Sequence, residues 1–87
     1  MNSEMHAPVT VEARFEADGS IRPLAFMLDQ QLIRIASLGR QWEHNGERHF
    51  LVMSPDERVH ELAYLPQQGV WRLCRRPQAP GETAIRV

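Results

Sequence analysis

The sequence contains no lysine. All ten basic residues are arginines, set against eleven acidic residues, and the formal charge is −1. This balance argues against a dedicated polyanion binder, because affinity for phosphates comes from a surplus of basic residues. Cys74 is the only cysteine, which excludes an internal disulfide and gives no sign of an oxidising compartment. We therefore expect a cytoplasmic location.

Long hydrophobic runs are also missing. The longest, residues 24–28, has five residues, whereas a membrane-spanning helix needs about 20. The first eight residues lack the basic and apolar stretches of a signal peptide, so no membrane association is expected. The 87 residues, 43% of them hydrophobic, suffice for one small core. We expect a single domain at 9–76, between a flexible N-terminus at 1–8 and a flexible tail at 77–87.

Turn-forming residues divide the chain into short runs that contain apolar residues. This spacing is typical of all-β proteins. It predicts an antiparallel meander of five or six strands, curled into a small SH3-like barrel. The expected strands lie near residues 9–16, 21–28, 32–42, 48–53, 59–65 and 70–75. In the first of them, Val9, Val11, Ala13 and Phe15 alternate with polar residues, as in a half-buried strand.

The strongest hairpin signal is Asn45-Gly46. Both central residues of a type I′ turn need positive φ, which Asn and Gly tolerate. A two-residue loop here sets Trp42 opposite His49 and Glu43 opposite Arg48. The second pair brings opposite charges together across the strands, which supports this register.

Residues 23–38 allow two interpretations. Leu28, Leu32, Ile35 and Leu38 recur at helical spacing between Pro23 and Gly39, so a helix near 23–38 would make the protein α+β. However, the polar residues 29–31 stand where two strands would need a turn, and residues 32–35 include two β-branched residues. We favour two strands.

Several short motifs together resemble an uncharacterised family of short bacterial all-β domains that sometimes accompany Y-family-polymerase-like DNA-damage proteins. They are Arg22-Pro23 with the following apolar run, Gly39-Arg40-Gln41-Trp42, His49-Phe50-Leu51-Val52, Glu61-Leu62-Ala63-Tyr64 and Trp71-Arg72-Leu73. The resemblance spans residues 9–76. It implies a small SH3-like barrel and an association with DNA transactions, but no catalytic residue, since the family has no established activity.

No motif for catalysis or metal binding stands out. Among the histidines and Cys74, the nearest pair in the sequence is His44 and His49, which lacks the close spacing of a zinc motif and is not cross-strand in the hairpin register. Cys74 has arginines beside it in the sequence but no base, and a free cysteine usually packs as a small hydrophobe. We therefore predict no enzyme, no metal ligands and no cofactor.

The expected function is a non-enzymatic binding or accessory module, linked to DNA repair or to a protein partner. Homodimerisation through an edge strand is the alternative. Aromatic residues lie in strands that also carry arginines, an arrangement that in small barrels binds single-stranded nucleic acid. In so small a domain, however, Trp42, Phe50, Tyr64 and Trp71 are also expected to form the core.

The arginine pattern predicts a weak nucleic-acid surface at Arg72, Arg75 and Arg76. Three phosphate contacts give a salt slope of about −2 for single strands, at about −0.7 per contact. Titration of a labelled single strand should therefore show binding mainly at low ionic strength. Changing all three arginines to alanine should abolish it, and equal binding by the triple variant would exclude this surface.

Overall fold

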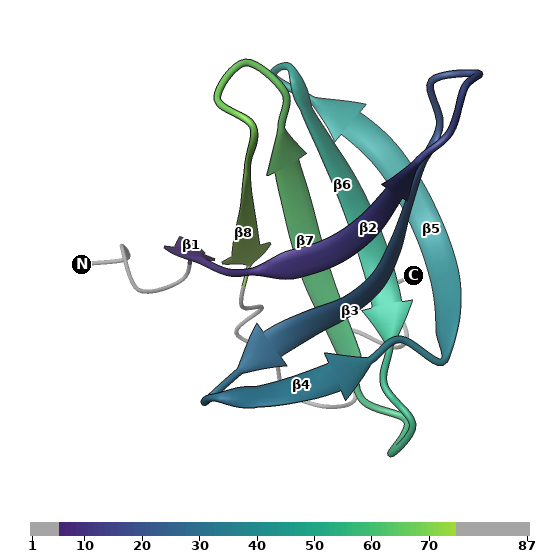
Figure 1. Ribbon diagram of the computed structural model, residues 1–87, viewed down its shortest axis with the longest axis vertical. Coiled ribbons are helices and arrows are strands. Elements are labelled where there is room, and N and C mark those ends of the chain that lie inside the picture. Colours follow the sequence, from purple (N-terminus) through teal and green to yellow (C-terminus); the bar gives the residue numbers. More distant parts are fainter. Residues whose placement is uncertain (1–5, 75–87) are drawn as a thin grey trace.

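The computed structural model describes residues 6–74 and contains no helix among them, so none of the described residues forms a helix that could span a membrane. Eight strands form two antiparallel sheets (Figure 1). The five-stranded sheet has the order β1-β8-β7-β6-β5, and the three-stranded sheet the order β2-β3-β4. The all-β prediction is confirmed.

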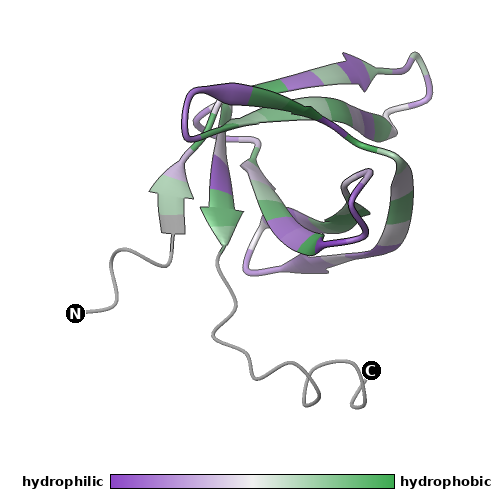
Figure 2. Ribbon diagram, turned by 90° about the horizontal axis from the view of Figure 1, so that it is seen from below, coloured by the Kyte–Doolittle hydropathy of each residue, from purple (hydrophilic) through white to green (hydrophobic). Residues whose placement is uncertain are grey.

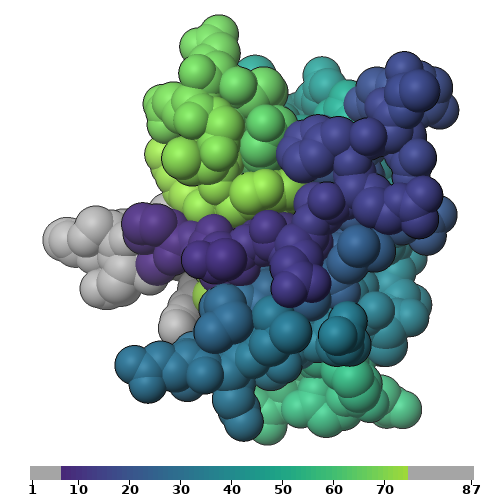
Figure 3. Space-filling view, viewed as in Figure 1, coloured from purple at the N-terminus to yellow at the C-terminus, as the bar shows by residue number. Residues whose placement is uncertain are grey.

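The five-stranded sheet consists of β1 (His6–Pro8), β5 (Ser37–His44), β6 (Glu47–Met53), β7 (Val59–Leu65) and β8 (Val70–Cys74). The three-stranded sheet consists of β2 (Val11–Phe15), β3 (Ile21–Leu28) and β4 (Gln31–Arg34). The smaller sheet lies across one face of the larger one, as the space-filling view shows (Figure 3). Along the strands, apolar and polar residues alternate (Figure 2).

The chain passes from one sheet to the other at two corners. At the first, between β1 and β2, the Val9 amide donates to the Trp71 carbonyl and the Met27 amide donates to the Thr10 carbonyl. At the second, between β4 and β5, the Ala36 amide donates to the Met53 carbonyl. The two sheets remain separate in their strand pairing, so the small β domain is not a closed barrel.

The strand count also differs from the expected five or six. The strand expected at 32–42 is divided into β4 and β5, because residues 35 and 36 turn the corner between the sheets. Residues 6–8, which were expected to belong to a flexible N-terminus, form β1 and pair with β8. The tail expected at 77–87 lies outside the described residues.

Residues 23–38 form strands rather than a helix. β3 and β4 are joined by Asp29 and Gln30, with φ of 51° and 66°, and Leu28 faces Gln31 in the resulting two-residue turn. Both values lie in the left-handed region, which these non-glycine residues adopt at some cost in free energy. The helical spacing of the leucines was therefore misleading, and the polar break was the better signal.

The core lies between the two sheets. Its fully buried large side chains include Phe26 from the small sheet and Phe50, Val52 and Leu62 from the large sheet. Trp71 packs among them and contacts the ring of Phe50 at 5.6 Å between centroids. The interpretation of the aromatic residues as core is therefore right for Phe50 and Trp71.

Two aromatic side chains depart from the expected pattern. Phe15 was expected on the inner face of its strand but is 58% exposed and contacts the rim of the core through the Tyr64 ring. A register shift between Glu12 and Ala13 interrupts the alternation before it. Trp42 lies on the face of the five-stranded sheet opposite the core, where it stacks on His49.

The β5–β6 hairpin has the predicted register. Trp42 faces His49, Glu43 faces Arg48, and Asn45 and Gly46 have φ of 54° and 78°. The Arg48 Nε donates to Glu43 Oε2 at 3.3 Å. Because residues on a strand alternate between faces, this turn decides that Phe50 enters the core while His49 lies on the opposite face.

Gly46→Val should destabilise the domain by about 1–2 kcal/mol, because a side chain at positive φ strains the backbone. A Cβ added at Gly46 meets no atom within 4 Å, so the loss would measure conformational strain rather than a clash. Urea unfolding would show a lower midpoint with an unchanged slope. Gly46→Asn is the matched control and should cost less, since Asn tolerates this conformation.

His60 makes the stability depend on pH. Its ring packs edge-on against Phe26 at 5.1 Å between centroids. Burial lowers the pKa of His60 from its usual 6.5; the charge of Asp56 opposes this shift and that of Arg58 adds to it. Because the folded pKa is the lower one, the unfolded chain binds the proton first as the pH falls.

The wild type should therefore lose stability as the pH falls from about 6.5 through the folded pKa of His60. His60→Gln should reduce this slope, although it also removes packing against Phe26 and lowers stability at neutral pH. Urea unfolding at several pH values separates the two effects. Identical slopes in the two proteins would contradict the assignment.

Candidate functional site

Two places in the described structure are candidates for a functional site. One is the free edge of β5, beside a hollow between the sheets. The other is a cluster of His49, Glu61 and Cys74 on the face of the five-stranded sheet opposite the core. Each is assembled from residues that lie far apart in the sequence.

The edge of β5 opposite β6 has no strand partner among residues 6–74. The other strands at sheet edges have three to five residues, whereas β5 has eight. Short edge strands, proline and lysine are common protections against unwanted pairing, and β5 contains neither proline nor lysine. The one protection that β5 has is the register shift between Leu38 and Gln41, since an irregularity of this kind hinders pairing with another strand.

A hollow of about 570 Å³ opens beside this edge, between β5 and the β2–β3 turn. Leu38 and Gln41 border it from β5, on the side of the strand that faces the core. The opposite border includes Ile21 and Arg22, together with the acidic residues of the turn. The volume lies within the range of ordinary binding pockets.

Charges around the hollow are unequally paired. The Asp18 carboxylate accepts hydrogen bonds from the amide and hydroxyl of Ser20, which lower its pKa and keep it ionised. Glu16 lies 3.5 Å from the Nε of Arg14. In the part of the chain that the structure describes, Arg22 forms no ion pair, and Asp18 has no basic partner. Arg40 also forms no ion pair there, but it does not border the hollow and lies against Trp42 on the opposite face of β5.

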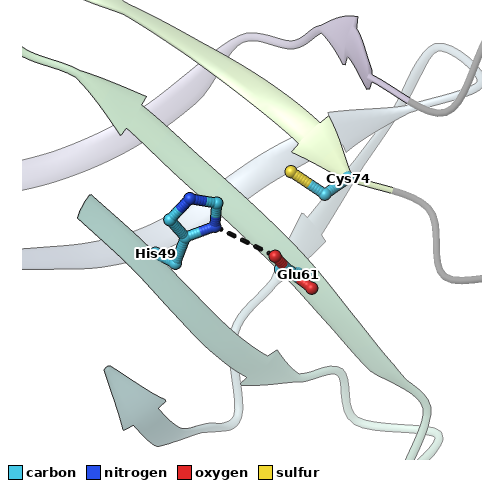
Figure 4. A group of neighbouring side chains, drawn as sticks. All are labelled: His49, Glu61 and Cys74. Carbon is cyan, nitrogen blue, oxygen red and sulfur yellow. Dashed lines mark hydrogen bonds and ion pairs between the residues drawn. The ribbon is translucent and has the colours of Figure 1, made fainter. Parts of the chain in front are cut away.

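The cluster of His49, Glu61 and Cys74 spans three neighbouring strands, β6, β7 and β8 (Figure 4). A nitrogen of His49, a carboxylate oxygen of Glu61 and the Cys74 Sγ all lie within 4.8 Å of one another. The Nδ1 of His49 is 2.9 Å from Glu61 Oε2. His49 is 7% exposed and Cys74 5% exposed, so the cluster is buried.

Other residues hold the His49 ring in place. Trp42 stacks on it at 5.2 Å between centroids, with an interplanar angle of 11°, and Arg40 lies 5.3 Å from the centre of the Trp42 ring. On the far side of the imidazole, Glu47 Oε1 is 3.2 Å from Nε2. This distance suits a hydrogen bond but the direction does not, so the buried Nε2 lacks a well-directed partner among the described residues.

Nothing in the sequence joins these three residues. The nearest histidine pair there is His44 and His49, and no base stands beside Cys74. In the structure His49 is that neighbour. Cys74 also packs as a small hydrophobe with Ala63 and Leu65, so its thiol is both buried and close to an imidazole. Pairing of Glu61 with Cys74 across β7 and β8 was the missing signal.

The predicted nucleic-acid surface is only partly described. Arg72 lies on the face of β8 opposite the core-facing Trp71 and Leu73. It is half-buried, with its Nη1 4.0 Å from Glu47 Oε2. Arg75 and Arg76 lie outside the described residues. The structure therefore places one of the three arginines, and that one is close to a carboxylate.

Comparisons with known proteins add no further assignment. No family model matches the chain, and neither the curated proteins nor the solved structures gave a significant match. The resemblance to a DNA-damage-associated family thus stays a prediction, and the functional argument depends on the geometry alone.

Proposed function

We propose that this protein is a non-enzymatic, SH3-like binding module that takes up an extended, acidic segment of a partner protein along the edge of β5. The observation that carries the proposal is the eight-residue edge strand, which has one strand partner in the described structure and lies beside a hollow. Alternate residues of such an edge direct N–H and C=O groups outward. An extended peptide binds there by completing the hydrogen bonds of another strand.

The side chains around the edge define the kind of segment. Leu38 and Ile21 offer apolar surface in the hollow, which suits an apolar side chain of the partner. Arg22 beside the hollow and Arg40 on the other face of β5 form no ion pair in the described structure, which suits acidic side chains. A segment in which acidic and apolar residues alternate satisfies both requirements, because successive side chains of a strand point to opposite faces.

A different protein fits this edge better than a second copy. The register shift between Leu38 and Gln41 leaves Gln41–His44 as the regular part of the edge beyond it. In a symmetric dimer each β5 would have to accommodate the irregularity of the other as well as its own. An unrelated segment has to follow only one. Homodimerisation is accordingly an outcome of the test rather than the proposal.

The burial of the only thiol supports a role without catalysis. A nucleophilic cysteine needs access to its substrate, and Cys74 is 5% exposed. The His49 imidazole in the same cluster already bonds to Glu61 through Nδ1. The binding role also accords with the resemblance to domains that accompany DNA-damage proteins, where a protein partner is as suitable a ligand as DNA.

The probe for this proposal is a peptide of four Glu-Val repeats, titrated into the isotope-labelled full chain. We expect amide shifts in NMR spectra that are concentrated at residues 37–44 and at Arg22. A peptide of Lys-Val repeats should bind more weakly. The double variant Arg22→Gln/Arg40→Gln should weaken binding of the Glu-Val peptide about fivefold, if each exposed contact contributes about 0.5 kcal/mol.

Arg34→Gln is the matched control, because Arg34 is another exposed arginine without an ion pair in the described structure but does not border the hollow. It should leave the affinity unchanged. Equal loss in the control, equal binding of the lysine peptide, or shifts away from β5 would overturn the proposal. A concentration-dependent dimer broken by changes in β5 would instead establish homodimerisation.

A further inference from the structure

We propose that His49, Glu61 and Cys74 form a zinc-binding site. This site is independent of the β5 edge, because its three residues lie on β6, β7 and β8 and zinc binding does not need a partner protein. Three neighbouring strands bring one nitrogen, one oxygen and one sulfur within 4.8 Å of one another (Figure 4). These are the three atom types by which proteins hold zinc.

The distances suit a tetrahedral ion. Zinc lies about 2.0–2.3 Å from such ligands, which places neighbouring ligand atoms about 3.3–3.7 Å apart. The His49–Glu61 contact of 2.9 Å and the 4.8 Å limit for the whole group bracket this range. Because the strands are hydrogen-bonded neighbours, the ligands start close to their final positions.

The choice of ligands favours zinc over other common ions. A thiolate and an imidazole bind zinc well, whereas magnesium and calcium prefer sites made of oxygen ligands. His49 and Cys74 are almost completely buried, so an ion held by them would be shielded from water.

The surroundings of His49 match those of a metal ligand. A histidine that binds metal through one ring nitrogen usually donates the other N–H to a carboxylate, which fixes the ring. Here Nδ1 points to Glu61, while Glu47 Oε1 lies 3.2 Å from Nε2. Arg72 in turn lies 4.0 Å from the other oxygen of Glu47, and Trp42 holds the plane of the ring by stacking. Glu47 therefore lies close to the second ring nitrogen without a well-directed hydrogen bond to it, and stacking on Trp42 holds the ring.

The test is a titration of the full-length, chelator-treated protein with cobalt, a spectroscopic substitute for zinc. We expect one equivalent to bind, with a thiolate-to-cobalt charge-transfer absorption that zinc abolishes by competition. Cys74→Ser should remove this absorption. His49→Gln and Glu61→Gln, which remove ligands, should each weaken binding by more than about tenfold, the smallest loss typical of changing a residue that supports a ligand.

His44→Gln is the matched control. Its ring is exposed and lies 6.3 Å from that of His49 between centroids, yet it is not part of the cluster. It should bind cobalt as the wild type does. Circular dichroism establishes whether each variant is folded, and the wild-type spectrum decides the question even if a variant unfolds. No thiolate absorption in the wild type, or equal loss in His44→Gln and His49→Gln, would overturn the proposal.

Discussion

The register of the β5–β6 hairpin is the constraint on which the rest of the structure depends. Asn45 and Gly46 adopt positive φ and close a two-residue turn. A slip of one residue would exchange the two faces of β6, placing His49 in the core and Phe50 on the opposite side. Strands β7 and β8 follow β6 in antiparallel pairing, so the same choice also decides where Leu62, Glu61 and Cys74 lie.

This constraint explains why much of the fold could be predicted. Asn-Gly is a local signal that favours one turn geometry. It correctly predicted the pairing of Trp42 with His49. The polar break at residues 29–31 similarly outweighed the helical spacing of the surrounding leucines. In both cases the information lies within a few residues of the turn, which is the range over which a single sequence is informative.

The parts that could not be predicted depend on contacts between distant segments. β1 forms because residues 6–8 pair with the edge of β8, more than 60 residues later in the chain. The corner at residues 35–36 interrupts a run that is locally suited to a continuous strand, because the chain must pass from one sheet to the other. Neither event leaves a local trace. The absence of a closed barrel has the same origin, because closure depends on strand pairing between the two sheets.

The candidate sites show this limit most clearly. Glu61 and Cys74 face each other only because Leu65 and Val70 pair across the turn between β7 and β8. His49 reaches Glu61 on the diagonal, since Ala63 is directly opposite it and diagonal neighbours are within reach of long side chains. Two registers must therefore be known before the cluster can be recognised. The turn at residues 66–69 was visible in the sequence, but its register was not.

The energetic cost of this cluster argues that it has a purpose beyond stability. Removing polar side chains such as His49 and Glu61 from water costs free energy, and replacing a buried polar pair by apolar side chains of the same shape can be neutral or stabilising. A domain of this size has a small margin of stability. Ala63, Leu65 and Cys74 already make a small apolar cluster on the same face of the sheet, which more apolar side chains could have extended. A buried histidine, fixed by Trp42 and flanked by two carboxylates, is therefore better explained by a ligand that it binds than by the fold that it belongs to.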